Sequence, residues 1–296
     1  MQRIAFSIIA IVAILFLFTQ YSLQEKRKGT NTTQKIALEQ TTLPQLDTKK
    51  MWGSAAKEMF PDITEPNYIE ASQASFLKDE DEVLVLKAGS TTYVYPLSIM
   101  SFHHIVNDVI DKEPVAITYC LLADTAISFK RNINGKEIEL GILGPLYMGD
   151  LVMYDKKTDG YFLQITGQGF NGTYNGKVLP TYKNIARERW GSIKNMNNLR
   201  VLGPVKDLQF YTNFYNQRKT ATIGVNSITT KGMKVDARLP EFTKGVGLIT
   251  SKGPVFLRLE EKNLDEEILQ KLPEHSLAVQ AYWYVWSSLF PRTSIQ

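Results

Sequence analysis

Short runs of β-branched and aromatic residues, separated by turn-forming residues, dominate the sequence between residues 82 and 170. The clearest pair is EVLVLK (82–87) and TTYVYPL (91–97), which are joined by Ala88-Gly89-Ser90. Two such runs with a short Gly-containing turn between them are typical of a β-hairpin. Runs of the same kind follow at PVAITYC (114–120), AISFKR, KEIELGIL, LYMGDLVMYD and GYFLQITGQGF, with Asn132–Gly135, Gly160 and Asn171-Gly172 as turn markers. The pattern predicts an α+β protein built mainly from antiparallel β-sheet, with a few packed helices.

One segment changes from strand to helical periodicity. In SIMSFHHIVNDVI (98–110), Ile99, Phe102 and Val106 recur at helical spacing, and Ser98 is placed to act as an N-cap. The sequence therefore predicts a helix here, ended by Asn107 and Asp108 before Pro114.

Other segments predict shorter or less regular elements. Helices are expected over 185–193 and 259–272, and a short one over 52–60 that stops at Pro61. A long loop-rich stretch is expected to extend to about residue 240. The aromatic residues near the end of the chain suggest a sugar or membrane surface, but their helical spacing favours a core role; they are Tyr282, Trp283, Tyr284, Trp286 and Phe290.

The order of elements occurs twice. VGLIT (246–250) and PVFLRL (254–259) repeat the hairpin of 82–97, the helix expected at 259–272 corresponds to 98–110, and LAVQAYW (277–283) aligns with VAITYCL (115–121). We therefore expect two unequal copies of a β-hairpin–helix–strand unit. The main domain would span 51–240, and a shorter second copy, 241–296, would pack on it.

The N-terminus contains an apolar run, Ile4 to Phe18, that reaches a membrane-spanning length when Thr19 to Leu23 are included. TQYSLQ offers no good signal-peptidase pattern, so an uncleaved anchor over 1–23 is favoured over a signal peptide. Residues 24–50 are polar and predict a stalk. Lys26, Arg27 and Lys28 follow the run and argue against an exported body by the positive-inside rule, although by a small margin.

Composition narrows the chemistry. A single cysteine excludes an internal disulfide and, with only three histidines, also a Cys-rich zinc site. The net charge is only +4, and no basic run outside the stalk resembles a nucleic-acid footprint. We therefore expect no metal, no cofactor and no nucleic-acid partner.

Several motifs occur together, in order, from about residue 81 to 296: PLSIMSFHHIVND, PVAITYC, LYMGDLVMYDKKT, LQITGQ and AYWYVWSSLFPRT. In this set the chain resembles the bacterial family named domain of unknown function 3179. The resemblance implies an exported or membrane-attached protein, and the family brings no established biochemical activity with it.

The chain departs from the family pattern at polar positions. Where the family usually reads T-Y-C-x-L-C, this chain has Ala123 in place of the second cysteine. His104 replaces the glutamate of the family's His-Glu-Ile-Val-Asn-Asp, and Met148-Gly149 replace the Asn-Ser of Tyr-Asn-Ser-Asp. If paired thiols carry redox or metal chemistry in relatives, this member has lost it.

Cys120 is the candidate reactive group, with two interpretations. It is a nucleophile or metal ligand if His103 lowers its pKa, with Asp108 or Asp150 orienting the histidine, and otherwise a small buried apolar side chain. Asp150 and Asp155 point to opposite faces of an ideal strand and make a poor carboxylate dyad. The candidate binding residues are His103, Asn107, Asp108, Tyr119, Cys120, Tyr147, Asp150 and Gln164.

The sequence thus predicts a membrane-anchored envelope protein whose soluble body lies outside the cytoplasm. It is expected to be a non-catalytic binding or scaffold protein, attached to the membrane through residues 4–23, with an unknown protein or small molecule as partner. The alternative is a single-thiol enzyme, or a metal or redox protein, that uses Cys120 with His103.

Overall fold

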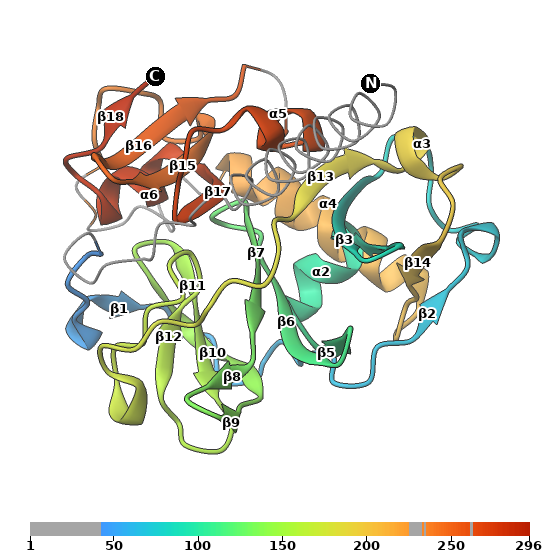
Figure 1. Ribbon diagram of the computed structural model, residues 1–296, viewed down its shortest axis with the longest axis horizontal. Coiled ribbons are helices and arrows are strands. Elements are labelled where there is room, and N and C mark those ends of the chain that lie inside the picture. Colours follow the sequence, from blue (N-terminus) through green and yellow to red (C-terminus); the bar gives the residue numbers. More distant parts are fainter. Residues whose placement is uncertain (1–42, 225–232, 234, 261–262) are drawn as a thin grey trace, which may run out of the picture. The chain divides into compact units, whose positions relative to one another are not determined.

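The computed structural model describes residues 43–224, 233, 235–260 and 263–296 (Figure 1). The expected membrane anchor and residues 24–42 of the expected stalk lie outside this part of the chain. Among the described residues, no helix is long and apolar enough to cross a membrane. Leu43 is buried, and the Asp47 amide donates a hydrogen bond to the Tyr147 hydroxyl, so the end of the expected stalk packs on the body.

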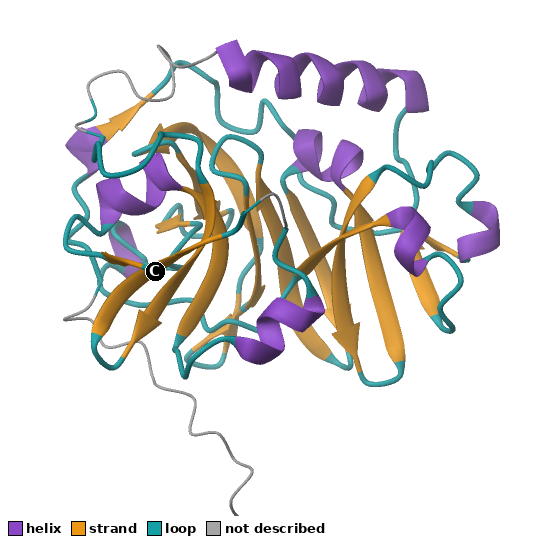
Figure 2. Ribbon diagram, turned by 90° about the horizontal axis from the view of Figure 1, so that it is seen from above, coloured by secondary structure: helices purple, strands orange, loops and turns teal. Residues whose placement is uncertain are grey.

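The predicted α+β class with mostly antiparallel sheet is confirmed. Figure 2 shows the strands grouped side by side, with the longest helix lying along one side of them. The helices of the described part are α2 (Leu97–His103), α3 (Trp190–Ile193), α4 (Leu208–Gly224), α5 (Glu266–Lys271) and α6 (Trp283–Leu289), with 3-10 turns η2 (Thr48–Lys50), η3 (Ala71–Gln73) and η4 (Gly172–Tyr174).

The first sheet is built around the predicted hairpin of residues 82–97. Its strands, in spatial order, are β13 (Ala186–Arg189), β3 (Glu82–Ala88), β4 (Thr91–Pro96), β14 (Leu199–Leu202) and β2 (Tyr68–Ile69). β13 is antiparallel to β3, whereas β14 is parallel to β4. The chain passes from β13 through α3 to β14, and therefore crosses the hairpin from one side to the other.

A second sheet repeats this arrangement. Its strands are β17 (Leu277–Tyr282), β15 (Lys244–Thr250), β16 (Gly253–Arg258) and β18 (Ser294–Ile295). β17 is antiparallel to β15, β18 is parallel to β16, and α6 connects β17 to β18. An added Cβ at Gly247 would lie 2.2 Å from the Trp286 ring, so α6 packs directly on the β15 backbone.

The residue register of the two sheets also matches. Leu84 of β3 pairs with Tyr95 and Arg187, and Val246 of β15 pairs with Leu257 and Gln280. The counterpart of β17 is therefore β13. The sequence predicted residues 115–121 as the counterpart of β17. That segment instead belongs to a different sheet, where it pairs with residues 105–110 on one side and with residues 125–130 on the other.

That third sheet places β6 (Glu113–Cys120) between β5 (Ile105–Ile110) and β7 (Thr125–Lys130). Because side chains alternate along a strand, β6 faces two hydrophobic cores: Tyr119 lies in one and Cys120 in the other. The remaining strands are β1 (Met51–Trp52), β10 (Leu140–Tyr147), β11 (Asp150–Asp155) and β12 (Tyr161–Leu163), which form one sheet, and the hairpin β8 (Asn132–Ile133) and β9 (Lys136–Glu137).

The helix expected over 98–110 is wrong in its second half. α2 ends at His103, His104 adopts a positive φ of 57°, and the chain continues as β5. Four of the six residues of β5 are β-branched Ile or Val, which favour a strand, and β5 pairs along its whole length with β6. The N-cap is Pro96, so Ser98 does not cap the helix.

Other expected helices are shorter or absent. Residues 185–193 divide into β13 and α3, and within 259–272 the described helix is only α5, capped by the Asp265 side chain on the Ile268 amide. Residues 52–60 form no helix, because the chain there runs from β1 into turns.

The segment expected to be loop-rich contains α4, the longest described helix. Phe210 and Phe214 lie one helical turn apart and both contact Phe102 of α2 edge to face. α4 is therefore stabilised by packing against α2. A helix stabilised in this way can form without a strong helical pattern in its own sequence, which is why the sequence predicted a loop here.

The core role expected for the C-terminal aromatic residues is confirmed. Trp283, Tyr284 and Trp286 are fully buried on α6, and the Trp286 and Phe290 rings lie 4.3 Å apart.

Candidate functional site

Cys120 lies at the end of β6, where its thiol is buried. Its Sγ accepts a hydrogen bond from the Ala123 amide at 3.4 Å and lies 4.0 Å from the Gly149 carbonyl oxygen. Burial raises the pKa of this thiol strongly, and the nearby Asp150 carboxylate raises it further. Cys120 is therefore held as the neutral thiol, which is a weak nucleophile.

Asp150 and Gln164 lie in the same buried region as Cys120. Asp150 Oδ2 accepts a hydrogen bond from the Ile165 amide at 2.7 Å, whereas Oδ1 has no partner among the described residues. Burial raises the pKa of Asp150 to about 7, against the opposing effect of the hydrogen bonds it accepts. Gln164 Nε2 donates to the Thr118 hydroxyl at 3.0 Å, and its Oε1 likewise lacks a described partner.

His103 is held away from the sulfur. Its Nδ1 donates to the Pro61 carbonyl at 2.6 Å, and its Nε2 lies 2.8 Å from the Tyr211 hydroxyl of α4. Burial lowers the pKa of His103 and favours the neutral ring. Both ring nitrogens are engaged, so this arrangement does not make His103 the base of Cys120.

Three further candidates have structural contacts in separate places. Asn107 donates to the Leu140 carbonyl and accepts from the Leu140 amide, and so joins β5 to β10. Asp108 accepts from the Tyr68 hydroxyl at 2.7 Å. Because Asn107 and Asp108 belong to β5, their expected role in ending a helix is wrong. Tyr147 contacts the chain near Asp47.

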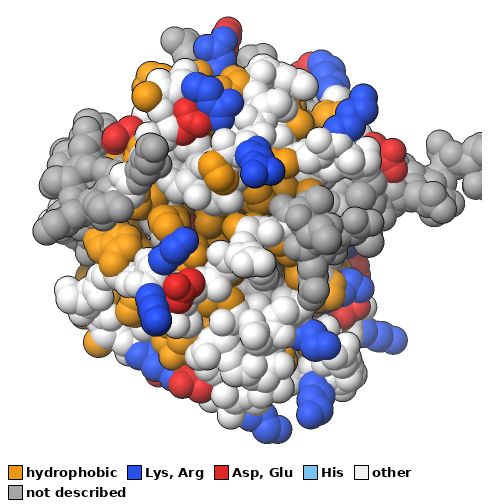
Figure 3. Space-filling model, turned by 90° about the vertical axis from the view of Figure 1, so that its left-hand side faces the viewer, with side chains coloured by type: hydrophobic (Ala, Val, Ile, Leu, Met, Phe, Trp, Pro, Cys, Tyr) orange, Lys and Arg blue, Asp and Glu red, His pale blue; other side chains and the backbone are white. Residues whose placement is uncertain are grey.

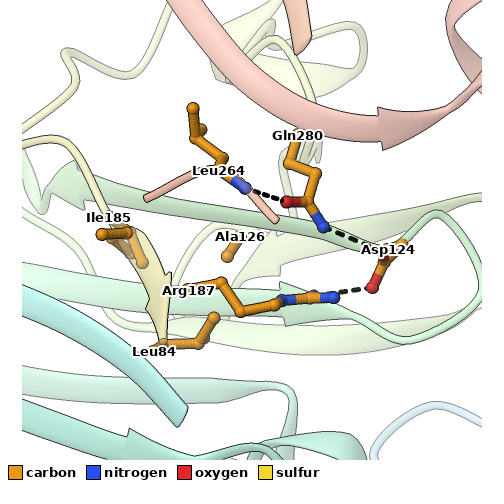
Figure 4. Close-up of a pocket in the computed structure, with 8 residues that line it drawn as sticks. Leu84, Asp124, Ala126, Ile185, Arg187, Leu264 and Gln280 are labelled. Carbon is orange, nitrogen blue, oxygen red and sulfur yellow. Dashed lines mark hydrogen bonds and ion pairs between the residues drawn. The ribbon is translucent and has the colours of Figure 1, made fainter. Parts of the chain in front are cut away.

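Tyr119, the remaining candidate, points to a different group of polar side chains. Its hydroxyl donates to Asp124 Oδ1 at 3.1 Å, and its ring lies 5.5 Å from the Arg187 guanidinium. Arg187 Nη2 donates to the same carboxylate at 2.6 Å, and Gln280 Nε2 donates to Asp124 Oδ2 at 2.9 Å. Figure 4 shows the Arg187 and Gln280 side chains converging on Asp124 from two strands.

Arg187 and Gln280 occupy matching positions of the two similar sheets. Each pairs with the first strand of its hairpin: Arg187 lies opposite Leu84 of β3, and Gln280 opposite Val246 of β15. Each also stands three residues before the tryptophan that begins the following helix. The Leu264 backbone connects the two, because its carbonyl accepts from the Arg187 amide and its amide donates to Gln280 Oε1.

Half-buried polar residues surround the Arg187–Asp124 ion pair. Glu82 accepts from Asn263 Nδ2 at 2.8 Å and from the Tyr215 hydroxyl at 3.3 Å. Lys244 Nζ lies 3.4 Å from Asp124 and 3.3 Å from Asn263 Oδ1. We call this group of polar residues the ionic cleft. Its members are Glu82, Tyr119, Asp124, Arg187, Tyr215, Lys244, Asn263 and Gln280.

The charges of the ionic cleft stabilise one another. Burial alone would raise the pKa of Asp124 and Glu82, but attraction to Arg187 and Lys244 outweighs it and lowers both values. Burial would lower the pKa of Arg187, but Asp124 and Glu82 hold it well above its usual range. Asp124, Glu82 and Arg187 therefore stay ionised beside one another.

The ionic cleft includes open space as well as charge. A space of about 10 Å³, room for roughly one water molecule, lies beside Arg187 and Gln280 and is partly open to solvent. Apolar side chains of Leu84, Ile185 and Leu264 line it. The space thus has a charged floor and an apolar wall.

Sequence reasoning found Tyr119 but missed the residues around it. The available signal was a charged or amide side chain three residues before a tryptophan, in IARERW and VQAYW. On the face shown in Figure 3, basic and acidic side chains are interspersed among hydrophobic ones, and the described side chains form no continuous basic surface there.

These features define an α+β protein with two topologically matching sheets and a charge-compensated cleft. A family model described as a protein of unknown function (DUF3179) matches residues 57–261. The chain belongs to the DUF3179 family. Comparisons with curated proteins and with solved structures gave no match.

Proposed function

We propose that this protein is a non-catalytic binding protein of the cell envelope, and that it binds a small polar molecule in the ionic cleft. The observation that carries the proposal is the convergence of charged and amide side chains from both matching sheets on one partly open space. Fixed polar groups beside an apolar wall bind and orient small molecules.

The state of the thiol favours binding over catalysis. A catalytic cysteine needs a lowered pKa and an adjacent base. Burial and Asp150 instead raise the pKa of Cys120, and His103 makes its hydrogen bonds elsewhere. The alternative function, a single-thiol enzyme or redox protein, would need the opposite arrangement.

We also propose that residues 4–23 anchor the chain in the membrane with the body outside the cytoplasm, and that the two matching sheets arose from one duplicated unit. The uninterrupted apolar run supports the anchor. Matching topology and register support the duplication.

Alkylation of Cys120 tests the non-catalytic assignment. We expect iodoacetamide to leave Cys120 of the native full chain unmodified between pH 6 and 8, and to modify it in denaturant, as measured by intact mass. Ser251→Cys, at an exposed turn position, is the matched control and should react in the native protein. Native-state alkylation of Cys120 at the rate of this control would refute the assignment and favour the enzyme.

A further inference from the structure

Large apolar side chains are exposed around the start of α4. Val205, Leu208 and Phe210 are 56%, 41% and 39% exposed, and they are three of the six large apolar side chains that are exposed in the described part of the chain. We call these three residues the α4 patch. Figure 2 shows α4, the longest helix, at the outer edge of the body. An exposed apolar patch bordered by polar residues marks an interaction surface.

Aromatic rings support the α4 patch and extend it. The Phe210 ring lies 4.8 Å from the ring of Phe102 in α2, and Phe102 lies 5.8 Å from Phe60. Phe60 and Phe102 are themselves partly exposed, and Met59, the neighbour of Phe60, is 53% exposed. The apolar surface therefore continues from α4 across α2 to the segment before Pro61, on a base of packed rings.

A cation borders the same surface. Lys206 is exposed, and its Nζ lies 5.7 Å from the ring centroids of both Phe102 and Phe210. Lys206 forms no ion pair with any described residue, so its charge is available to a further partner. The sequence of α4 contains two basic residues and no acidic one. Apolar and aromatic side chains accompanied by basic ones are suited to the surface of a bilayer with anionic headgroups.

The proposed anchor keeps a bilayer near this surface. Leu43 is buried in the body, and the chain between Leu23 and Leu43 reaches at most about 70 Å when fully extended. An anchored body therefore stays close to the membrane. A second contact with the same membrane is then intramolecular, and a small patch is enough to favour it.

We propose that the body docks on the membrane surface through Val205, Leu208 and Phe210, with the Lys206 ammonium at the lipid phosphates. This inference rests on the proposed anchor and is independent of the ionic cleft. The apolar side chains enter the boundary between headgroups and acyl chains. The long Lys206 side chain lies along the aromatic rings and extends its charge to the headgroups.

Fluorescence quenching in vesicles tests this proposal on the full chain. Thr212→Cys places a label one helical turn after Leu208 on the same face of α4, and Ser251→Cys places one in the exposed turn between β15 and β16. Because Cys120 is buried, a nitrobenzoxadiazole label modifies the introduced cysteine. The vesicles contain phosphatidylcholine, phosphatidylglycerol and a nitroxide lipid. Quenching at residue 212 should exceed quenching at residue 251 at least about threefold.

Variants separate the apolar and the ionic contribution, with the label at residue 212. Leu208→Gln should weaken docking by about fivefold, because the exposed part of this side chain no longer gains from leaving water. Lys206→Gln should weaken it by about fivefold with phosphatidylglycerol and by less without it, because a charge near an anionic surface is lost. Met196→Gln is the matched control and should leave docking unchanged. Met196 is also 41% exposed, but it lies before β14, whereas Val205 follows that strand.

Four results would overturn the docking. Equal quenching at residues 212 and 251, in a chain that the vesicles retain after a carbonate wash, would refute it and leave the anchor standing. A chain that the wash removes would refute the anchor and the docking together. Equal effects of Met196→Gln and Leu208→Gln would mean that the α4 patch is not the contact. A dimer in detergent that Leu208→Gln dissociates would assign the patch to a second copy of the chain.

Discussion

Asp124 and Asp150 are both buried carboxyl groups, but their surroundings drive their pKa values in opposite directions. Asp124 faces Arg187, Lys244 and Gln280, and its pKa is lowered despite burial. Asp150 forms no ion pair with any described residue, and burial raises its pKa to about 7. Charge partners rather than depth of burial therefore decide which carboxyl remains ionised.

Replacing Arg187 tests the importance of the first arrangement. Arg187→Met should lower the free energy of unfolding by about 3–5 kcal/mol, because the buried Asp124 carboxylate loses its closest cation and keeps only the more distant Lys244. Urea denaturation at pH 7 measures this change. Lys194→Ala, which removes the exposed pair with Asp79, is the control and should lose less than about 1 kcal/mol.

Adding Asp124→Asn to the Arg187→Met variant should recover part of the lost stability, since it removes the buried charge that has lost its closest partner. A fully additive loss in the double variant would contradict the ion-pair explanation.

The second arrangement predicts a pH effect. A carboxyl whose pKa is higher in the folded state binds its proton more tightly there, so stability falls as pH rises between about 4 and 7. Asp150→Asn should remove this loss and gain on the order of 4 kcal/mol relative to the parent between pH 4 and 8. Denaturation of both proteins across this range measures the difference, and parallel pH curves for the two would rule out a raised pKa at Asp150.

At the scale of the elements, β5 shows how the periodicity of apolar residues misleads. Ile99, Phe102 and Val106 are all apolar and fit one helical face, but Val106 belongs to a strand that begins after the turn at His104. Strands bracketed by clear turn residues, such as β3 and β4, could be predicted because their signals are local. α4 could not, because its aromatic residues are stabilised by contact with α2.

Asn107 provides a test of the link between β5 and β10. Asn107→Leu leaves the Leu140 amide and carbonyl without these side-chain partners, and we expect a loss of at least about 2 kcal/mol in the free energy of unfolding. Val109→Ala, on the exposed face of the same strand, should change it by less than about 0.5 kcal/mol. Equal effects in urea denaturation would remove Asn107 as a structural link.

At the scale of the whole described body, the ionic cleft is also what joins the two matching sheets. The Arg187 amide of the first sheet donates to the Leu264 carbonyl, between β16 and α5, so a backbone hydrogen bond accompanies the side-chain contacts. This site could not be found from sequence alone, because its members become neighbours only after both sheets have formed and packed. Cys120, Asp150 and Gln164 were easier to select, because they stand in contiguous motifs.

This connection predicts coupled unfolding of the two sheets. Hydrogen exchange should give amides of β4 and β16 the same free energy of opening in the parent protein, because neither sheet opens alone. In Arg187→Met the two values should separate. Unequal values already in the parent would mean that the sheets are independent.

The two-sided burial of β6 has an evolutionary consequence. Tyr119 and Cys120 are adjacent in sequence but face different interiors, so each can be substituted under its own constraints, with the strand acting as a partition between them. A one-residue deletion or insertion in this strand is another matter. It would turn the Cys120 side chain toward Arg187 and the Tyr119 side chain toward Asp150. Related sequences should therefore vary in residue type here far more often than in the length of this strand.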